Sequence, residues 1–247
     1  EDESWHARFS WKEDDRALPL SAPGFDRPGA QEPRGAELDT RQWSLAVGRR
    51  QNAGDVEWGW RAEWLEQTKT YDDPDDMVGG RGERHNEYRA QRAGFAVDAS
   101  LAIGESHFAE LLFDYSHETL DVRGDVVQGL GGLDSFAQES LNIHLQDTIA
   151  LDGTGNFLLT PVLRWNGLDG EGKFSWGAGV IRELKNGWSW RASFGSYNRA
   201  PNIYERYGDG AGIRPAPDLL WEDGTQADVG VRWRGAVGDL LVAAGAT

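Results

Sequence analysis

The feature that most constrains this chain is an alternation of apolar and polar residues with a period of two. Between positions 56 and 64 every even residue is apolar, whereas the odd residues are Glu57, Gly59, Arg61 and Glu63. Successive side chains of a β-strand point to opposite faces, so this pattern predicts a strand with one apolar and one polar face. The pattern recurs at residues 5–11, 43–47, 93–101, 109–115, 141–151, 157–165, 174–180, 188–194, 227–233 and from about 240. We therefore predict an all-β, antiparallel fold of about eleven strands, each of roughly ten residues, which is the length that crosses a tilted bilayer span.

The joints between these segments alternate in length. Short, turn-like joints are expected at residues 52–55, 104–106, 153–156, 185–187 and 236–239. Longer joints are expected at residues 16–39, 72–87, 121–136, 166–172 and 198–224. Outer-membrane β-barrels have short turns at one end and longer loops at the other, so we predict strict alternation between the two kinds of joint.

Aromatic residues fall at two levels of the predicted strands, with smaller aliphatic residues between them. Trp58, Trp188, Trp190 and Trp233 lie near the short joints, whereas Trp11, Trp43, Trp64, Tyr88, Tyr115, Trp165, Phe174 and Trp176 lie toward the long ones. Two aromatic girdles are typical of a barrel that crosses both membrane interfaces. The opposite face is rich in Arg, Glu, Asp, Ser and Gly, which suits a hydrated or plugged lumen. We therefore predict an antiparallel transmembrane β-barrel.

Two residues fit this pattern badly. Asp147 falls on the lipid-facing parity of its strand, so we expect either a bulge or a position near the short-joint interface. Pro161 lies within a strand and has no amide hydrogen for the ladder, so we expect a local bulge there.

Composition excludes several other classes of protein. The formal net charge of −16 and the lack of a basic stripe argue against nucleic-acid binding. The sequence contains no Cys, which excludes disulfides and thiolate metal sites, and it has no apolar run long enough for a transmembrane helix. No nucleophile elbow or zinc-protease motif is present, so we predict no catalytic residue, no metal site and no cofactor.

The most specific stretch of sequence lies between residues 193 and 233. It contains Arg199-Ala200-Pro201, then Tyr204-Glu205, then Ala216-Pro217-Asp218-Leu219, and finally Glu222 before a further strand. This ordered string resembles the TonB-dependent receptor barrel, in which Arg-Ala-Pro-x-Leu-Tyr-Glu is followed by Asn-Pro-Asp-Leu and Pro-Glu. Ala216 stands where the family usually has Asn, and Trp221 stands where it has Pro.

The resemblance implies a specific transport machine. Such receptors have a barrel of about 22 strands filled by an N-terminal plug domain, bind a small nutrient at the outer loops and are driven by the TonB complex. Residues 1–247 are then expected to be part of the barrel domain, with the plug domain and the C-terminal strands missing, and not to fold alone. The expected location is the bacterial outer membrane, in contact with lipid and lipopolysaccharide. The expected function is active uptake of a ferric siderophore, haem or cobalamin.

Two other functions remain open. A passive porin or adhesin barrel would share the strand pattern without a plug, and a soluble all-β binding module would turn its apolar face toward a core. An upstream plug domain separates uptake from the passive barrel. Fractionation and heat-modifiable migration separate both from the soluble module.

The ligand-contact candidates lie in the stretch that carries the resemblance. We choose Arg199, Tyr204, Arg206 and Tyr207, because Arg and aromatic side chains are favoured at binding hot spots. The alternative is that these four side chains only order the loop. Asp72, Asp73, Asp75 and Asp76 flank Pro74 in an acidic joint that suits Ca²⁺ chemically but lacks EF-hand spacing, so a solvated charged loop is favoured.

Overall fold

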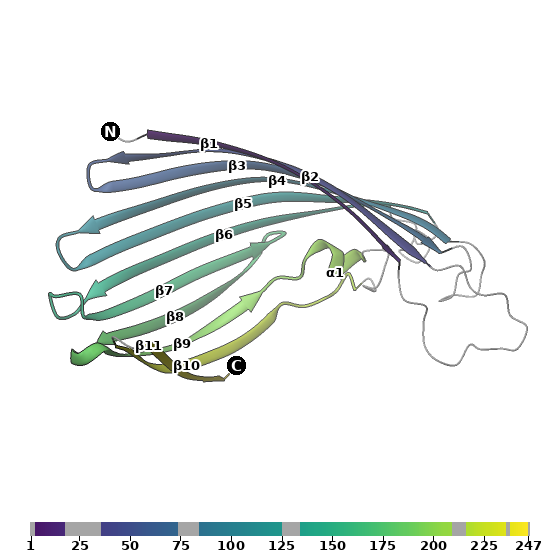
Figure 1. The fold of residues 1–247 in the computed structure, drawn as a ribbon. Coiled ribbons are helices and arrows are strands. Elements are labelled where there is room, and N and C mark those ends of the chain that lie inside the picture. Colours follow the sequence, from purple (N-terminus) through teal and green to yellow (C-terminus); the bar gives the residue numbers. More distant parts are fainter. Residues whose placement is uncertain are drawn as a thin grey trace, which may run out of the picture.

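The computed structural model describes residues 3–17, 36–73, 84–124, 134–208, 216–235 and 238–246, which form one antiparallel sheet of eleven strands in sequence order. The strands are β1 (Glu3–Ala17), β2 (Glu37–Ala53), β3 (Val56–Asp73), β4 (Arg84–Ile103), β5 (His107–Gly124), β6 (Ser135–Ala150), β7 (Phe157–Leu168), β8 (Glu171–Glu183), β9 (Trp188–Arg199), β10 (Glu222–Gly235) and β11 (Gly238–Ala246). Among the described residues, one short α-helix, α1 (Ile203–Tyr207), follows β9, and a 3₁₀ turn, η2 (Lys185–Gly187), lies between β8 and β9. The sheet is curved and α1 lies on its concave side (Figure 1). None of the helical segments in the described ranges has the length and hydropathy of a transmembrane helix.

The strand register confirms the predicted alternation, because it aligns apolar residues into continuous rows across the sheet. One such row runs over six strands through Trp60, Val97, Phe113, Ile143, Trp165 and Phe174. The neighbouring row on the other face runs through Arg61, Ala96, Asp114, Asn142, Asn166 and Lys173. We call the apolar-row side the outer face and the other side, which carries α1, the inner face. Large outer-face side chains such as Phe9 and Phe174 are 67% and 70% exposed, so this face is not a protein core.

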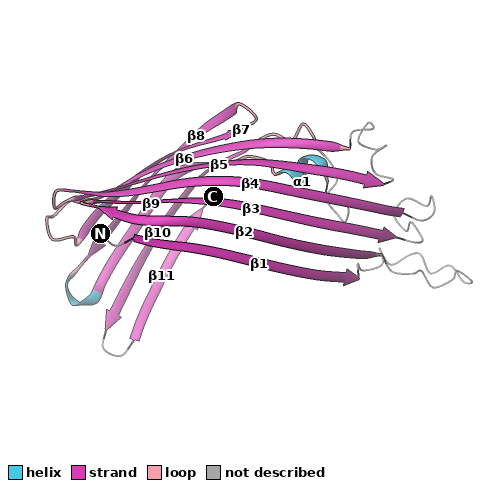
Figure 2. Cartoon of the chain, turned by 90° about the horizontal axis from the view of Figure 1, so that it is seen from above, coloured by secondary structure: helices cyan, strands magenta, loops and turns pink. Residues whose placement is uncertain are grey.

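The sheet has two distinct ends. The turns at residues 54–55, 104–106 and 151–156 lie together at what we call the short-turn end, and the opposite end, where β3 and β9 stop, is the long-loop end (Figure 2). In the described sheet, β1 and β11 are edge strands and each pairs with one neighbour only. The number of strands was predicted correctly. Their length was not, since β2 to β5 have 17 to 20 residues. At the long-loop ends of β3 to β6, inner-face side chains contact α1.

The predicted long joint at residues 166–172 is wrong. Leu168 pairs directly with Glu171, so the joint consists of Asp169 and Gly170 alone. Both residues have positive φ, 50° and 86°, which is the two-residue hairpin turn that an Asp-Gly pair favours. The Asp169 carboxylate accepts a hydrogen bond from the Glu139 amide at 2.8 Å and so ties the turn to β6. Strict alternation of short and long joints therefore fails at this position.

The two misfits have different outcomes. At Pro161 the β6–β7 ladder is interrupted, because Gln146 pairs with Val162 and the next pair is Ile149 with Leu159. The register is the same on both sides of the gap, so the predicted bulge is absent and only hydrogen bonds are lost. Asp147 lies opposite that gap near the short-turn end, where His107 Nδ1 lies 2.7 Å from its Oδ2. Asp147 therefore lies toward the short-turn end without a bulge, and its position at a membrane interface stays a prediction.

Candidate functional site

The helix α1 forms because the residues before it set its first turn. Pro201 lies two residues after Arg199, the last residue of β9, and cannot extend the ladder. Asn202 then caps the helix: its side chain accepts a hydrogen bond from the Glu205 amide at 2.9 Å, and the Glu205 carboxylate accepts one from the Asn202 amide at 2.9 Å. This reciprocal pair is a capping box. Five residues are too few for an isolated helix in water, so contacts with the sheet must supply the remaining stability.

The main contact of α1 is an apolar cluster on the inner face. Ile203 is fully buried against side chains at the long-loop ends of β4, β5 and β6. The members on these strands are Tyr88, Ala90, Leu120, Val122 and Phe136. Tyr207 stacks on Phe136 with ring centroids 3.9 Å apart and an interplanar angle of 16°. Because these strand positions have inner-face parity, α1 is held inside the curve of the sheet.

A second set of contacts joins α1 to β3. The Tyr204 hydroxyl donates to Gln67 Oε1 at 2.8 Å. The Lys69 ammonium lies 4.1 Å from the centroid of the Tyr204 ring, within the range of a cation–π interaction. Both the ring and the hydroxyl of Tyr204 therefore contact β3. These two contacts fix the direction in which α1 crosses the inner face.

Arg206 joins α1 to the β7–β8 turn. Its guanidinium lies 2.7 Å from Asp169 Oδ2 and 3.4 Å from Gln138 Oε1. Gln138 in turn donates to the Pro201 carbonyl at 3.5 Å, just before the helix. The tight Asp169–Gly170 turn is thus part of the site, because a longer joint would not hold this carboxylate at the end of α1.

Arg199 connects the end of β9 with α1 and with β10. Its guanidinium donates two hydrogen bonds to the Glu205 carboxylate, both at 3.0 Å, and two to Glu222 at 2.8 and 2.9 Å. The Arg199 guanidinium, followed by the Asn202 amide, holds the pKa of Glu205 below its ordinary value of 4.5. A carboxylate that also caps the helix is thereby kept ionised, and β9, α1 and β10 are joined through one cation.

The comparison with protein families identifies the family to which the sheet that carries this site belongs. Residues 4–246 match the family model described as TonB dependent receptor-like, beta-barrel. The chain belongs to the TonB-dependent receptor family. The match extends the resemblance from residues 193–233 to nearly the whole chain. This is a family of receptors and transporters whose barrels lie in the outer membrane of Gram-negative bacteria.

Solved structures show the same fold at low sequence identity. The FrpB iron transporter from Neisseria meningitidis has a TM-score of 0.69 and 16% identity, and the match covers 95% of this chain and 41% of that one. A mutant ferric enterobactin receptor from Pseudomonas aeruginosa, in complex with enterobactin, has a TM-score of 0.66 and 15% identity over 83% of this chain and 34% of that one. The copper transporter OprC has a TM-score of 0.66 and 14% identity over 82% and 38%. The chain thus spans about two-fifths or less of the length of these structures. A comparison with curated protein sequences gave no match.

All four predicted site residues of this TonB-dependent receptor lie in or beside α1. Tyr204, Arg206 and Tyr207 belong to the helix, and Arg199 contacts it through Glu205. Each of the four is engaged by the protein itself, as expected if they order the segment, and their contact with a ligand remains a prediction. The sequence reading missed Ile203, which anchors the helix. The spacing of Asn202 and Glu205, which is typical of a capping box, was the signal that could have located the helix.

The acidic joint after β3 is only partly described. Asp73 is 1% exposed and accepts a hydrogen bond from the Tyr71 hydroxyl at 3.0 Å, so this residue is not part of a solvated loop. Asp72 Oδ1 lies 2.5 Å from His85 Nδ1 on β4. Pro74, Asp75 and Asp76 lie outside the described residues. Within the described ranges, no three His, Asp or Glu side chains gather as a metal site, and the calcium alternative stays a prediction.

Proposed function

We propose that the protein containing this chain takes up a scarce nutrient actively through the outer membrane, with the TonB complex as its energy-coupling partner. Family membership supports the general class of receptor. Structures with the same fold are named as an iron transporter, a ferric enterobactin receptor and a copper transporter. These names favour a metal chelate as the nutrient, and a ferric siderophore, haem or cobalamin is the class that we propose.

The observation that carries this proposal is the anchoring of α1 on the inner face. An ordered element inside the mouth of a barrel narrows the water path, and a passive pore uses such an element only for selectivity. A receptor that must hold a ligand before transport needs fixed side chains at that place. Arg199, Tyr204, Arg206 and Tyr207 are held there by ion pairs, hydrogen bonds and stacking. We propose that their remaining accessible surfaces contact the nutrient.

The outer face supports the proposed membrane partner. Its apolar rows cross the sheet without a charged interruption over β3 to β8 at the level of Phe113. The middle of such a surface suits contact with the hydrocarbon chains of the membrane. The parts on the far side of the aromatic residues suit contact with the headgroups of lipid and lipopolysaccharide. The soluble alternative would require another layer to cover this face.

The deciding experiment measures uptake in cells. The complete reading frame containing the chain is expressed in a strain that lacks its own receptors, and radiolabelled iron is supplied as different siderophore chelates or as haem. We expect uptake of one chelate class that disappears in a tonB deletion or after addition of a protonophore. Uptake that persists without TonB supports the passive barrel instead. Recovery of the protein in the soluble fraction supports the binding module.

A further inference from the structure

Most arginine side chains on the outer face of the described sheet are paired with a carboxylate. These ion pairs have N···O distances of 2.8 to 3.0 Å and join Arg41 with Glu13, Arg49 with Glu3 and Arg89 with Glu66. Arg123 and Arg182 have no ion pair among the described residues, although acidic residues outnumber Lys and Arg by 41 to 25 in the sequence. Arg123 lies at the long-loop tip of β5, whereas Arg182 borders the apolar rows. Arg182 is therefore a cation at the edge of the apolar surface to which the described part of the chain supplies no counter-ion.

Arg182 is held between two aromatic side chains near the short-turn end. It is the penultimate residue of β8 and pairs with Phe157 on β7 and with Trp190 on β9. The two rings lie 6.4 Å apart, and the guanidinium carbon of Arg182 lies 5.1 Å from the centroid of the Phe157 ring. At a membrane interface, a long cationic side chain lays its apolar stem on such a surface and keeps its charged group among the headgroups.

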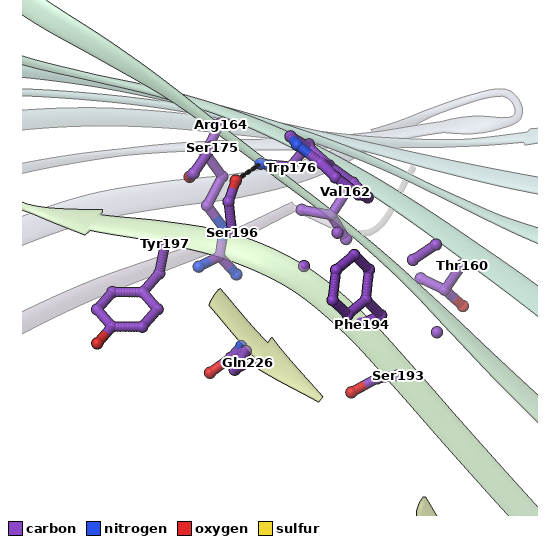
Figure 3. Close-up of a pocket in the computed structure, with 14 residues that line it drawn as sticks. Thr160, Val162, Arg164, Ser175, Trp176, Ser193, Phe194, Ser196, Tyr197 and Gln226 are labelled. Carbon is purple, nitrogen blue, oxygen red and sulfur yellow. Dashed lines mark hydrogen bonds between the residues drawn. The ribbon is translucent and has the colours of Figure 1, made fainter. Parts of the chain in front are cut away.

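The outer face of β8 and β9 is apolar from Arg182 toward the middle of the sheet. The next row consists of Leu159, Val180 and Ala192. Farther along, the rings of Trp176 and Phe194 contact each other with centroids 5.5 Å apart, and these side chains are 51% and 52% exposed (Figure 3). On these two strands, Arg182 is thus the first outer-face charge between the apolar band and the short-turn end, which is the level of lipid headgroups.

A second cation and two further Trp rings lie at the same end of these strands. Lys185 belongs to the turn η2, three residues after Arg182, and is exposed without an ion pair among the described residues. Trp188 and Trp233 lie at the short-turn ends of β9 and β10, with ring centroids 6.4 Å apart. Glu183 lies between the two cations in sequence, but it has inner-face parity. This end of the outer face therefore combines two available cations with an aromatic border.

The long-loop end of the outer face has the opposite balance of charge. The acidic residues with outer-face parity there are Glu13, Asp15, Glu37, Asp39, Glu66, Asp72, Glu87, Asp121 and Glu139. The Arg residues with that parity there are Arg41, Arg89 and Arg123. At the short-turn end, the outer-face carboxylates of Glu3 and Asp147 are already engaged by neighbouring side chains. An anionic lipid is therefore repelled at the long-loop end and attracted at the short-turn end of β8.

We propose that Arg182 and Lys185 bind the phosphate of an anionic phospholipid, of the phosphatidylglycerol type, in the periplasmic leaflet of the outer membrane. The short turns of an outer-membrane barrel lie on the periplasmic side, so both cations face that leaflet. Guanidinium and ammonium groups bind phosphate oxygens through charge-assisted hydrogen bonds. The lipid site rests on the membrane location in the proposed function, but not on the nutrient or on TonB.

The test is native mass spectrometry of the complete protein that contains this chain, purified in detergent and stripped of lipid. The protein is titrated with phosphatidylglycerol and, separately, with phosphatidylcholine that has the same acyl chains. We expect phosphatidylglycerol to bind at least fivefold more tightly. Arg182→Gln and Lys185→Gln should each weaken phosphatidylglycerol binding roughly fivefold, the contribution of one cation near an anionic lipid surface. Arg182→Lys, which keeps the charge, should stay within about twofold of the parent protein.

Arg49→Gln is the matched control. Arg49 also lies on the outer face near the short-turn end, with its guanidinium carbon 5.4 Å from the centroid of the Trp5 ring, but its charge is neutralised by Glu3. Phosphatidylglycerol binding should therefore change less than about twofold in this variant. Heat-modifiable migration of each variant shows that its barrel has folded.

Several outcomes would overturn the proposal. They are equal affinity for the two phospholipids, an unchanged Arg182→Gln variant, an equal loss in Arg49→Gln, and Arg182-dependent binding of lipopolysaccharide in place of phosphatidylglycerol. TonB-independent uptake with intact, Arg182-dependent lipid binding would refute only the proposed uptake. TonB-dependent uptake without a preference for phosphatidylglycerol would refute only the lipid site.

Discussion

Replacement of Ile203 by Ala tests whether α1 is held by apolar burial. Ile203 is fully buried in the cluster on β4 to β6, and removal of a buried Ile side chain costs about 2–4 kcal/mol, at the lower part of the usual range because a surface segment can partly collapse. The barrel wall does not depend on this residue, so the loss falls on the docking of α1. The equilibrium constant for opening of the segment should therefore rise roughly 30- to 700-fold.

Hydrogen exchange measured by mass spectrometry on the intact protein is the assay. Amides in residues 200–208 should exchange faster by that factor in Ile203→Ala, whereas peptides from β4 and β5 should change little. Ile181→Ala serves as a control, because Ile181 is 46% exposed and far from the cluster in the sheet. If the 200–208 peptide exchanges at the parent rate in Ile203→Ala, apolar burial does not hold α1. The ion pairs of Arg199 would then have to account for the docking.

Three further predictions concern acid, the tight turn and Gly195, where a Cβ atom would lie 2.6 Å from the Trp176 carbonyl oxygen. Because Arg199 holds the pKa of Glu205 below 4.5, the stabilisation from this ionised pair is complete above about pH 4.5 and is lost as the pH falls through the lower folded-state value. The protection factors of the amides at residues 200–208, which are corrected for the intrinsic exchange rate at each pH, should therefore fall more in acid for the parent than for Glu205→Gln. Gly195→Val should abolish assembly, seen as loss of heat-modifiable migration, whereas Gly179→Val should assemble because its Cβ meets nothing within 4 Å. Gly170→Val should fold but lose about 1–2 kcal/mol in urea unfolding, since φ is 86° and only conformational strain opposes the substitution.

The eleven-stranded sheet could be predicted because its alternation of apolar and polar residues is a local pattern. A strand that crosses a membrane repeats the same requirement at every second residue, and the apolar row through Trp60, Val97 and Phe113 is readable from each segment separately. Register then follows from short turns that leave little freedom in pairing. The number of strands, their order and the face of each side chain therefore follow from sequence alone.

The helix could not be predicted in the same way, whereas the tight turn carried a local signal that was missed, because Asp169-Gly170 is a pair that favours a two-residue hairpin. The segment from Ile203 to Tyr207 has too few residues for a helical period, and its burial depends on Leu120 and Phe136, which are far away in sequence. The lengths of β4 and β5 were underestimated for a related reason, because the long-loop ends of these strands carry the cluster residues Tyr88, Leu120 and Val122. The candidate Arg and Tyr residues were brought together as expected, but their protein partners are set by tertiary contacts.

The helix α1 and the end of β8–β9 pairing at Gly177 and Gly195 are two consequences of one path of the chain. If β9 continued beside β8 from Ser196 to Arg199, roughly four ladder hydrogen bonds would form, each worth about 1 kcal/mol. The chain instead bends inward, where burial of Ile203 contributes about 2–3 kcal/mol and the Tyr207 stack and the Tyr204 hydrogen bond about 1 kcal/mol each. The two sums are similar, so neither arrangement is excluded by backbone pairing alone. Weakening the docking of α1 by Ile203→Ala should therefore favour continued pairing of β9 with β8 beyond Gly177 and Gly195.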